Sequence, residues 1–125
     1  SMKTHLFYRQ RNADFLRDCR KAVAAPENAK MSLRAIAGRV AGSPARCYYV
    51  DPDYAARVIT RLRRGKIPTT TASASKWHEI AERVDSYMAR HPSVPLLHAV
   101  TEIVNNAAGS YFLSTQQALR IIYSQ

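Results

Sequence analysis

Three arginines, Arg57, Arg61 and Arg64, are spaced i, i+4 and i+7 in a segment whose pattern predicts a helix. That spacing stacks their side chains into one stripe, separate from the predicted apolar face. A guanidinium fork can hold two phosphate oxygens or the edge of a guanine, so the stripe is typical of a surface that binds nucleic acid. Five more basic residues complete the candidate nucleic-acid-binding set: Arg63, Lys66, Arg46, Arg34 and Arg39.

The positive charge is unevenly distributed along the chain. Of its 125 residues, positions 1–66 hold 15 Lys and Arg against 5 Asp and Glu, whereas positions 67–125 hold 4 of each. The whole net charge of +10 therefore falls in the first half. Solubility does not require such asymmetry, and we expect it to attract polyanions to one end of the molecule.

Six helices must position these residues. Asp51-Pro52 is a strong helix start and Gly65 a C-terminal cap, so the arginine stripe has clear boundaries. Ser32 and Ser114 cap two others, Asn12 can cap the first, with Asp14 in its first turn, and Ser73 or Ser75 can cap the fourth. The predicted helices cover about residues 13–24, 33–41, 52–64, 76–90, 95–105 and 115–123. An earlier start of the first helix, taking in Leu6 to Tyr8, is left open.

A shift of 63 residues aligns the second half with the first. Six of 29 aligned pairs are identical, where chance gives roughly two. The matches include Ala45 with Ala108, Tyr48-Tyr49-Val50 with Tyr111-Phe112-Leu113, and Arg57 with Arg120. The fold class we predict is mainly α, with two tandem helix–helix–short strand–helix repeats packed as one pseudo-twofold domain.

The domain boundaries follow from that repeat. A strongly basic first repeat covers 2–66, a linker 67–75 and a charge-neutral second repeat 76–125, in one compact domain. The two aromatic segments could pair as a small two-stranded ribbon, or form loops that plug the core. Tyr48, Tyr49 and Tyr54 could stack on bases, but the neutral repeat also keeps aromatics at 111 and 112, which favours core positions for Tyr48 and Tyr49.

No catalytic residue, cofactor-binding residue or metal ligand is predicted. The four histidines form no HxxxH or HExxH pattern, and no glycine-rich phosphate loop is present. Cys19 and Cys47 form no CxxC pair. Without an apolar run of roughly 18–20 residues we expect no membrane partner, a cytoplasmic location and reduced thiols.

These observations favour a nucleic-acid-binding protein, with double-stranded DNA ahead of RNA, acting in transcription regulation or as an architectural factor. The alternative is a protein–protein adaptor whose basic half docks an acidic partner. A homodimer is left open. The comparison with a helix-turn-helix is incomplete, because about nine residues, Gly42 to Val50, separate the second and third helices instead of three or four.

Overall fold

The computed structural model describes residues 2–66 and 71–125, with the backbone alone at 71–73. Within these ranges the chain forms six α-helices and one short 3-10 turn, η1, and contains no β-strand. The prediction of a mainly helical protein is confirmed. The elements are α1 (Met2–Ala24), η1 (Pro26–Asn28), α2 (Leu33–Ala41), α3 (Pro52–Arg63), α4 (Thr71–Arg90), α5 (Leu96–Val104) and α6 (Thr115–Tyr123).

Local capping chemistry starts three of these helices at the predicted residues. The side chains of Ser32, Asp51 and Ser114 each accept a hydrogen bond from a backbone N–H three residues on. Such bonds satisfy donors that the first helical turn leaves unpaired. At its other end, α3 stops at Gly65, which has a φ of 82°. The N–H groups of Gly65 and Lys66 then close the last turn on the carbonyls of Leu62 and Arg61.

Two helices begin earlier than predicted. Helix α1 starts at Met2, so Asn12 and Asp14 lie inside it and neither occupies its first turn. No glycine or proline interrupts residues 2–24, and the polar residues before Ala13 hide the helical period. Helix α4 starts at Thr71, which places Ser73 and Ser75 inside it and shortens the predicted linker 67–75. Residues 67–70 of that linker lie outside the described residues.

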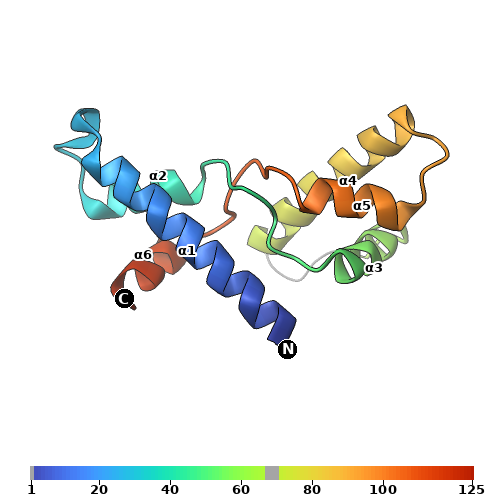
Figure 1. The fold of residues 1–125 in the computed structure, drawn as a ribbon, viewed down its shortest axis with the longest axis horizontal. Coiled ribbons are helices and arrows are strands. Elements are labelled where there is room, and N and C mark those ends of the chain that lie inside the picture. The colour runs from blue at the N-terminus through green and yellow to red at the C-terminus, as the bar shows by residue number, and fades with distance from the viewer. Residues whose placement is uncertain (1, 67–70) are drawn as a thin grey trace.

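The helices form two lobes (Figure 1). Helices α1, α2 and α6 pack together as the first lobe, and α3, α4 and α5 as the second. The third helix of each half of the sequence thus lies with the first two helices of the other half. The segment after α2 is long because it crosses from one lobe to the other, and α2 and α3 do not form a helix-turn-helix unit.

This exchange divides the basic first half of the sequence between the two lobes. The basic residues of α1 and α2 lie in the first lobe, whereas those of α3 lie in the second. A sequence half and a spatial lobe are therefore different things in this molecule.

Two crossing segments, residues 42–51 and 105–114, meet between the lobes (Figure 1). Ala45 and Ala108 exchange both backbone hydrogen bonds, at 3.1 and 2.9 Å, in one isolated antiparallel bridge. The two-stranded ribbon does not form: residues 48–50 and 111–113 are loops. The alternative prediction is that these segments are loops whose aromatic side chains fill the core. Tyr48, Tyr49 and Tyr111 fit that alternative, because all three are buried.

Tyr49 and Phe112 both adopt left-handed backbone conformations, with φ of 55° and 56°. This region is unfavourable for bulky side chains and persists only where the surroundings impose it. Tyr49 is held by burial, and Phe112 packs against the same core. The two residues are 63 positions apart, so both crossing segments bend at matching positions.

One contiguous cluster of buried side chains runs through both lobes and the crossing segments. Its largest fully buried members are Phe15, Ile59, Ile80, Val84, Val100 and Val104. Asp14 is the one charged residue buried among the described side chains. No described helix is long and apolar enough to cross a membrane.

Candidate nucleic-acid interface

The arginine stripe lies on the outer side of α3. Arg57, Arg61 and Arg64 are all exposed, and together with Ala56 and Thr60 they line a shallow depression of about 300 Å³. The opposite side of α3 is buried through Ala55, Val58 and Ile59. The helix therefore presents its basic side to solvent because its apolar side is committed to the second lobe.

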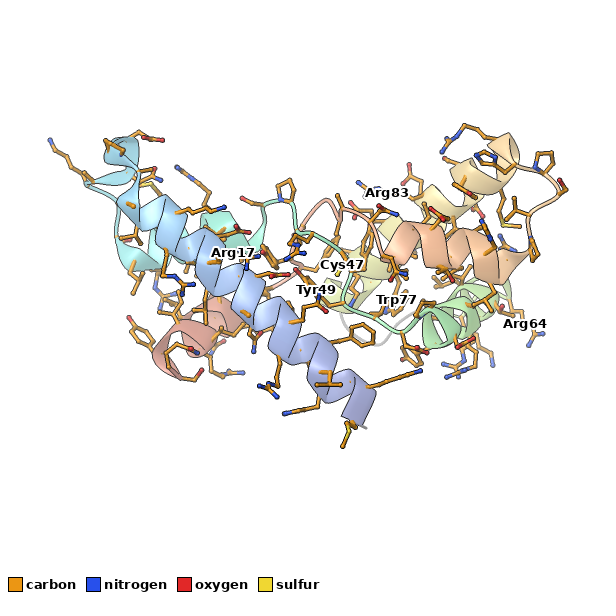
Figure 2. The ribbon with its side chains drawn as sticks, in the orientation of Figure 1. Arg17, Cys47, Tyr49, Arg64, Trp77 and Arg83 are labelled. Atoms are coloured by element: carbon orange, nitrogen blue, oxygen red, sulfur yellow. The ribbon has the colours of Figure 1, made fainter. Side chains whose placement is uncertain are left out.

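The three stripe arginines form no ion pair with any described residue. The guanidinium of Arg57 lies 5.8 Å from the ring centroid of Tyr54, a cation–π contact. Figure 2 shows Arg64 at the outer end of α3, pointing away from the body of the protein. These charges are not neutralised within the described chain and are available to an anionic ligand.

Arg63 has a different environment from its neighbours. Its Nη2 donates to Oδ1 of Asp85 on α4 at 3.1 Å and contacts the sulfur of Met88 at 3.6 Å. Both partners of the ion pair are well exposed, so the pair adds little stability. Arg63 nevertheless points toward α4, away from the stripe. Lys66 is exposed just past the glycine turn that ends α3.

The other three predicted residues lie elsewhere. Arg34 and Arg39 belong to α2 in the first lobe, where Arg39 donates to the side-chain oxygen of Asn28 at 3.1 Å. Arg46 belongs to the first crossing segment, 3.4 Å from Oδ1 of Asp14. The eight predicted residues are exposed but do not form one surface. Arg57, Arg61, Arg64 and Lys66 constitute what we call the α3 surface.

The aromatic residues divide between core and surface. Tyr48 and Tyr49 are buried, and their hydroxyls donate to Glu79 at 2.5 Å and Asp14 at 2.7 Å. Their interpretation as core residues is confirmed. Tyr54 is 45% exposed and meets Trp77 edge to face, with centroids 6.0 Å apart. Its ring is the one aromatic face beside the α3 surface among the three tyrosines considered.

A buried polar cluster around Asp14 was not foreseen. Its carboxylate accepts hydrogen bonds from Tyr49 and, at 2.6 Å, from Arg17. Burial alone would raise the pKa of Asp14, but these bonds and the nearby Arg46 charge bring that pKa below its ordinary value. Asp14 is therefore a structural anion at the centre of α1. In the sequence, the one sign that Asp14 is buried is its position next to the core residue Phe15.

No protein family, curated protein or solved structure matches this chain. Within the described ranges, no three His, Cys, Asp or Glu side chains are grouped so as to hold a metal ion. Two of the four histidines, His91 and His98, lie against the ring of Tyr87, at centroid distances of 4.4 and 6.5 Å. The geometry of the basic residues is therefore the basis for assigning a function.

Proposed function

We propose that this protein binds double-stranded DNA through the α3 surface, as a regulatory or architectural factor. The observation that carries the proposal is the exposed depression shared by Arg57, Arg61 and Arg64, which form no ion pair with a described residue. A helix about 10–12 Å across fits a major groove about 12 Å wide. Arginines at three successive turns would then reach phosphates or base edges.

The packing of α3 within its lobe also supports the proposal. It is the outer member of a three-helix lobe whose other members, α4 and α5, support its apolar side. Helix-turn-helix proteins present their recognition helix on similar support. In this protein the support comes from the other half of the sequence, which explains the long connection that follows α2.

We also propose that the two halves are copies of one unit, packed as a pseudo-twofold domain with their third helices exchanged. The reciprocal Ala45–Ala108 bonds and the matching φ of Tyr49 and Phe112 support this. Helix α6 then corresponds to α3. It keeps Arg120 in the place of Arg57 but has Ser124 in the place of Arg61, so α3 is the stronger DNA contact.

The remaining basic residues take secondary roles in this proposal. Arg34 and Arg39 offer phosphate contacts on the first lobe, whereas Arg46 and Arg63 are partly engaged by Asp14 and Asp85. Contacts from both lobes would require a longer or bent stretch of DNA, as architectural proteins use. We propose a cytoplasmic location, where Cys19 and Cys47, both free in the structure, stay reduced.

The test is fluorescence anisotropy with random double-stranded DNA, single-stranded DNA and RNA at two salt concentrations. The double variant Arg61→Ala/Arg64→Ala should weaken binding and lower the slope of log K against log salt by about two. Its melting temperature should stay close to that of the wild type, since both side chains are exposed. Arg20→Ala/Lys21→Ala, which removes the same charge from exposed positions of α1, is the matched control.

Equal losses in the two double variants would show that only net charge matters and would remove the α3 surface as the site. A stronger affinity for RNA or single strands would replace double-stranded DNA as the target. No binding even at low salt would favour the protein–protein adaptor. For that alternative, an apolar depression of about 270 Å³, lined by residues including Leu16, Val23 and Leu33, offers a contact area.

A further inference from the structure

A second cationic feature lies between the lobes, away from the α3 surface. A cavity of about 290 Å³ opens where the crossing segments meet α1 and the first turns of α4. Figure 2 shows Tyr49 and Cys47, two of its wall residues, in this central position. Arg11 of α1 and Lys76 of α4 both line it, and no described acidic residue does.

Neither cation forms an ion pair with a described residue. Among the described residues the Arg11 guanidinium has two neutral partners: its Nε donates to the Asn12 side-chain oxygen at 3.1 Å, and it lies 4.7 Å from the ring centroid of Tyr8. The ammonium of Lys76 lies 5.5 Å from the ring centroid of Trp77, with no hydrogen-bond acceptor within the described residues.

The two cations also repel each other. Burial is the main cause that lowers the pKa of Lys76 to about 8, and the neighbouring charge of Arg11 lowers it further. Burial likewise lowers the pKa of Arg11. Partly buried charges are ordinarily paired, as Asp14 is by Arg17, because an uncompensated charge is costly to remove from water. Two such charges line the same open cavity.

We propose that this cavity binds a small organic oxyanion, a phosphate ester or a carboxylate, between Arg11 and Lys76. Arginine supplies a planar two-point contact and lysine a mobile point charge. Walls formed by Tyr8, Tyr49 and Tyr111 suit a flat apolar portion of the ligand. The volume lies near the lower limit for small-molecule sites, which restricts the occupant to about the size of a mononucleotide or an aromatic acid.

The proposal does not depend on DNA binding, because none of the residues that form the α3 surface lines this cavity. A bound anion would contact α1 of one lobe and α4 of the other at once. It would therefore stiffen the junction between the lobes.

The experiment follows the Lys76 side chain by NMR as a function of pH, with inorganic phosphate, a 5′-mononucleotide or benzoate added at constant ionic strength. A ligand between the two cations should move the pKa of Lys76 from about 8 back toward its ordinary 10.5 and raise the melting temperature. Chloride at the same ionic strength should do neither. An unchanged Lys76 titration with all three anions would overturn the proposal.

Variants separate the site from general charge effects. Lys76→Met and Arg11→Met should each weaken anion binding at least tenfold, whereas Lys30→Met, at an exposed site outside the cavity, should leave it unchanged. Lys76→Met should also melt at a higher temperature than the wild type without anion, which shows that the variant folds. The double variant Arg61→Ala/Arg64→Ala should keep the shift of the Lys76 pKa on anion binding even if it no longer binds DNA.

The same NMR titration of Lys76 is repeated with the random double-stranded DNA of the binding test. A shift of the Lys76 pKa with DNA, and none with the small anions, would reassign these cations to the nucleic-acid backbone and overturn the small-molecule proposal. If DNA binding fails altogether but the small anions still shift that pKa, the cavity site stands and the proposed function falls.

Discussion

Tyr49 and Tyr111 stack with their rings 8° from parallel and their centroids 6.2 Å apart, one from each crossing segment. Their hydroxyls donate to two carboxylates of the same helix: Tyr49 to Asp14 at 2.7 Å and Tyr111 to Asp18 at 2.6 Å. Helix α1 thus holds both crossing segments through one pair of rings. The junction between the lobes depends on polar contacts as well as on apolar burial.

Replacing Asp14 should destabilise this junction. Asp14→Ala leaves the buried Tyr49 hydroxyl without its acceptor, so we expect a loss of about 2–3 kcal/mol in the free energy of unfolding at neutral pH, measured by urea titration. The control is Asp53→Ala, at an exposed position in the first turn of α3. It removes only a favourable charge at the helix N-terminus, so it should cost ~0.3–1 kcal/mol.

The same substitution should change the pH dependence of stability. The folded-state pKa of Asp14 lies below its ordinary 3.8, so its contribution is complete above that value and is lost as pH falls through the folded pKa. The difference between wild type and Asp14→Ala should therefore shrink on acidification below about pH 4. A difference that stays constant down to acid unfolding would contradict the assignment of Asp14 as an ionised hydrogen-bond acceptor.

Three of the seven tyrosines should resist ionisation at alkaline pH. Burial, and then hydrogen bonds to Glu79, Asp14 and Asp18, raise the pKa values of Tyr48, Tyr49 and Tyr111. Titration followed by tyrosinate absorbance should show these three ionising only as the protein unfolds, and Tyr48→Phe should reduce that set to two. Complete ionisation of all seven before unfolding would show that the hydroxyls are not buried as described.

A side chain at position 109 should be unfavourable while Glu79 is in place. Oε2 of Glu79 accepts from the Gly109 N–H at 3.0 Å and from the Tyr48 hydroxyl, and a Cβ at position 109 would overlap the Glu79 carboxylate. We expect Gly109→Ala to cost about 1–3 kcal/mol, chiefly by displacing that carboxylate. In a Glu79→Ala background the cost should nearly vanish, so a double-mutant cycle measured by chemical unfolding is the test.

Because α3 and α6 each pack in the lobe of the other half of the sequence, a core substitution in either helix should lower hydrogen-exchange protection in a specific partner helix. Ile121→Ala in α6 should reduce hydrogen-exchange protection in α2 more than in α5, because α6 packs on α2. Ile59→Ala in α3 should do the reverse. Each removes a buried side chain and should cost about 2–4 kcal/mol. If Ile121→Ala instead affects α5 first, the third helices are not exchanged.

Several features were predictable from sequence because they depend on near neighbours. Ser32, Asp51 and Ser114 cap their helices through bonds to residues three positions away, and Gly65 ends α3 through its own left-handed φ. The exposed side of α3 follows from helical spacing. The same spacing places Arg63 about 100° from Arg64 around the helix, which is why Arg63, a member of the candidate set, lies outside the stripe.

Long-range relationships were not predictable. Shifting the sequence by 63 residues predicts the same buried positions whether α3 packs on α2 or on α5, so the exchange of helices leaves no trace in the pattern. Arg11 and Lys76 are 65 positions apart, and only the crossing of the two loops brings them to one cavity. The early start of α1 was hidden because residues 2–12 bury little, and Asp14 was therefore misplaced in a first turn.

The exchange of helices has a consequence for the newly made chain. The lobe begun by α1 is completed by α6, which follows α3, α4 and α5 along the chain, so α1 and α2 must keep an apolar side uncovered while those helices are being synthesised. Contacts between residues so distant in sequence form slowly, and an uncovered apolar side invites association with other molecules. The first lobe thus cannot close until α6 has been synthesised, and we expect chaperones to bind the nascent helices α1 and α2 before then.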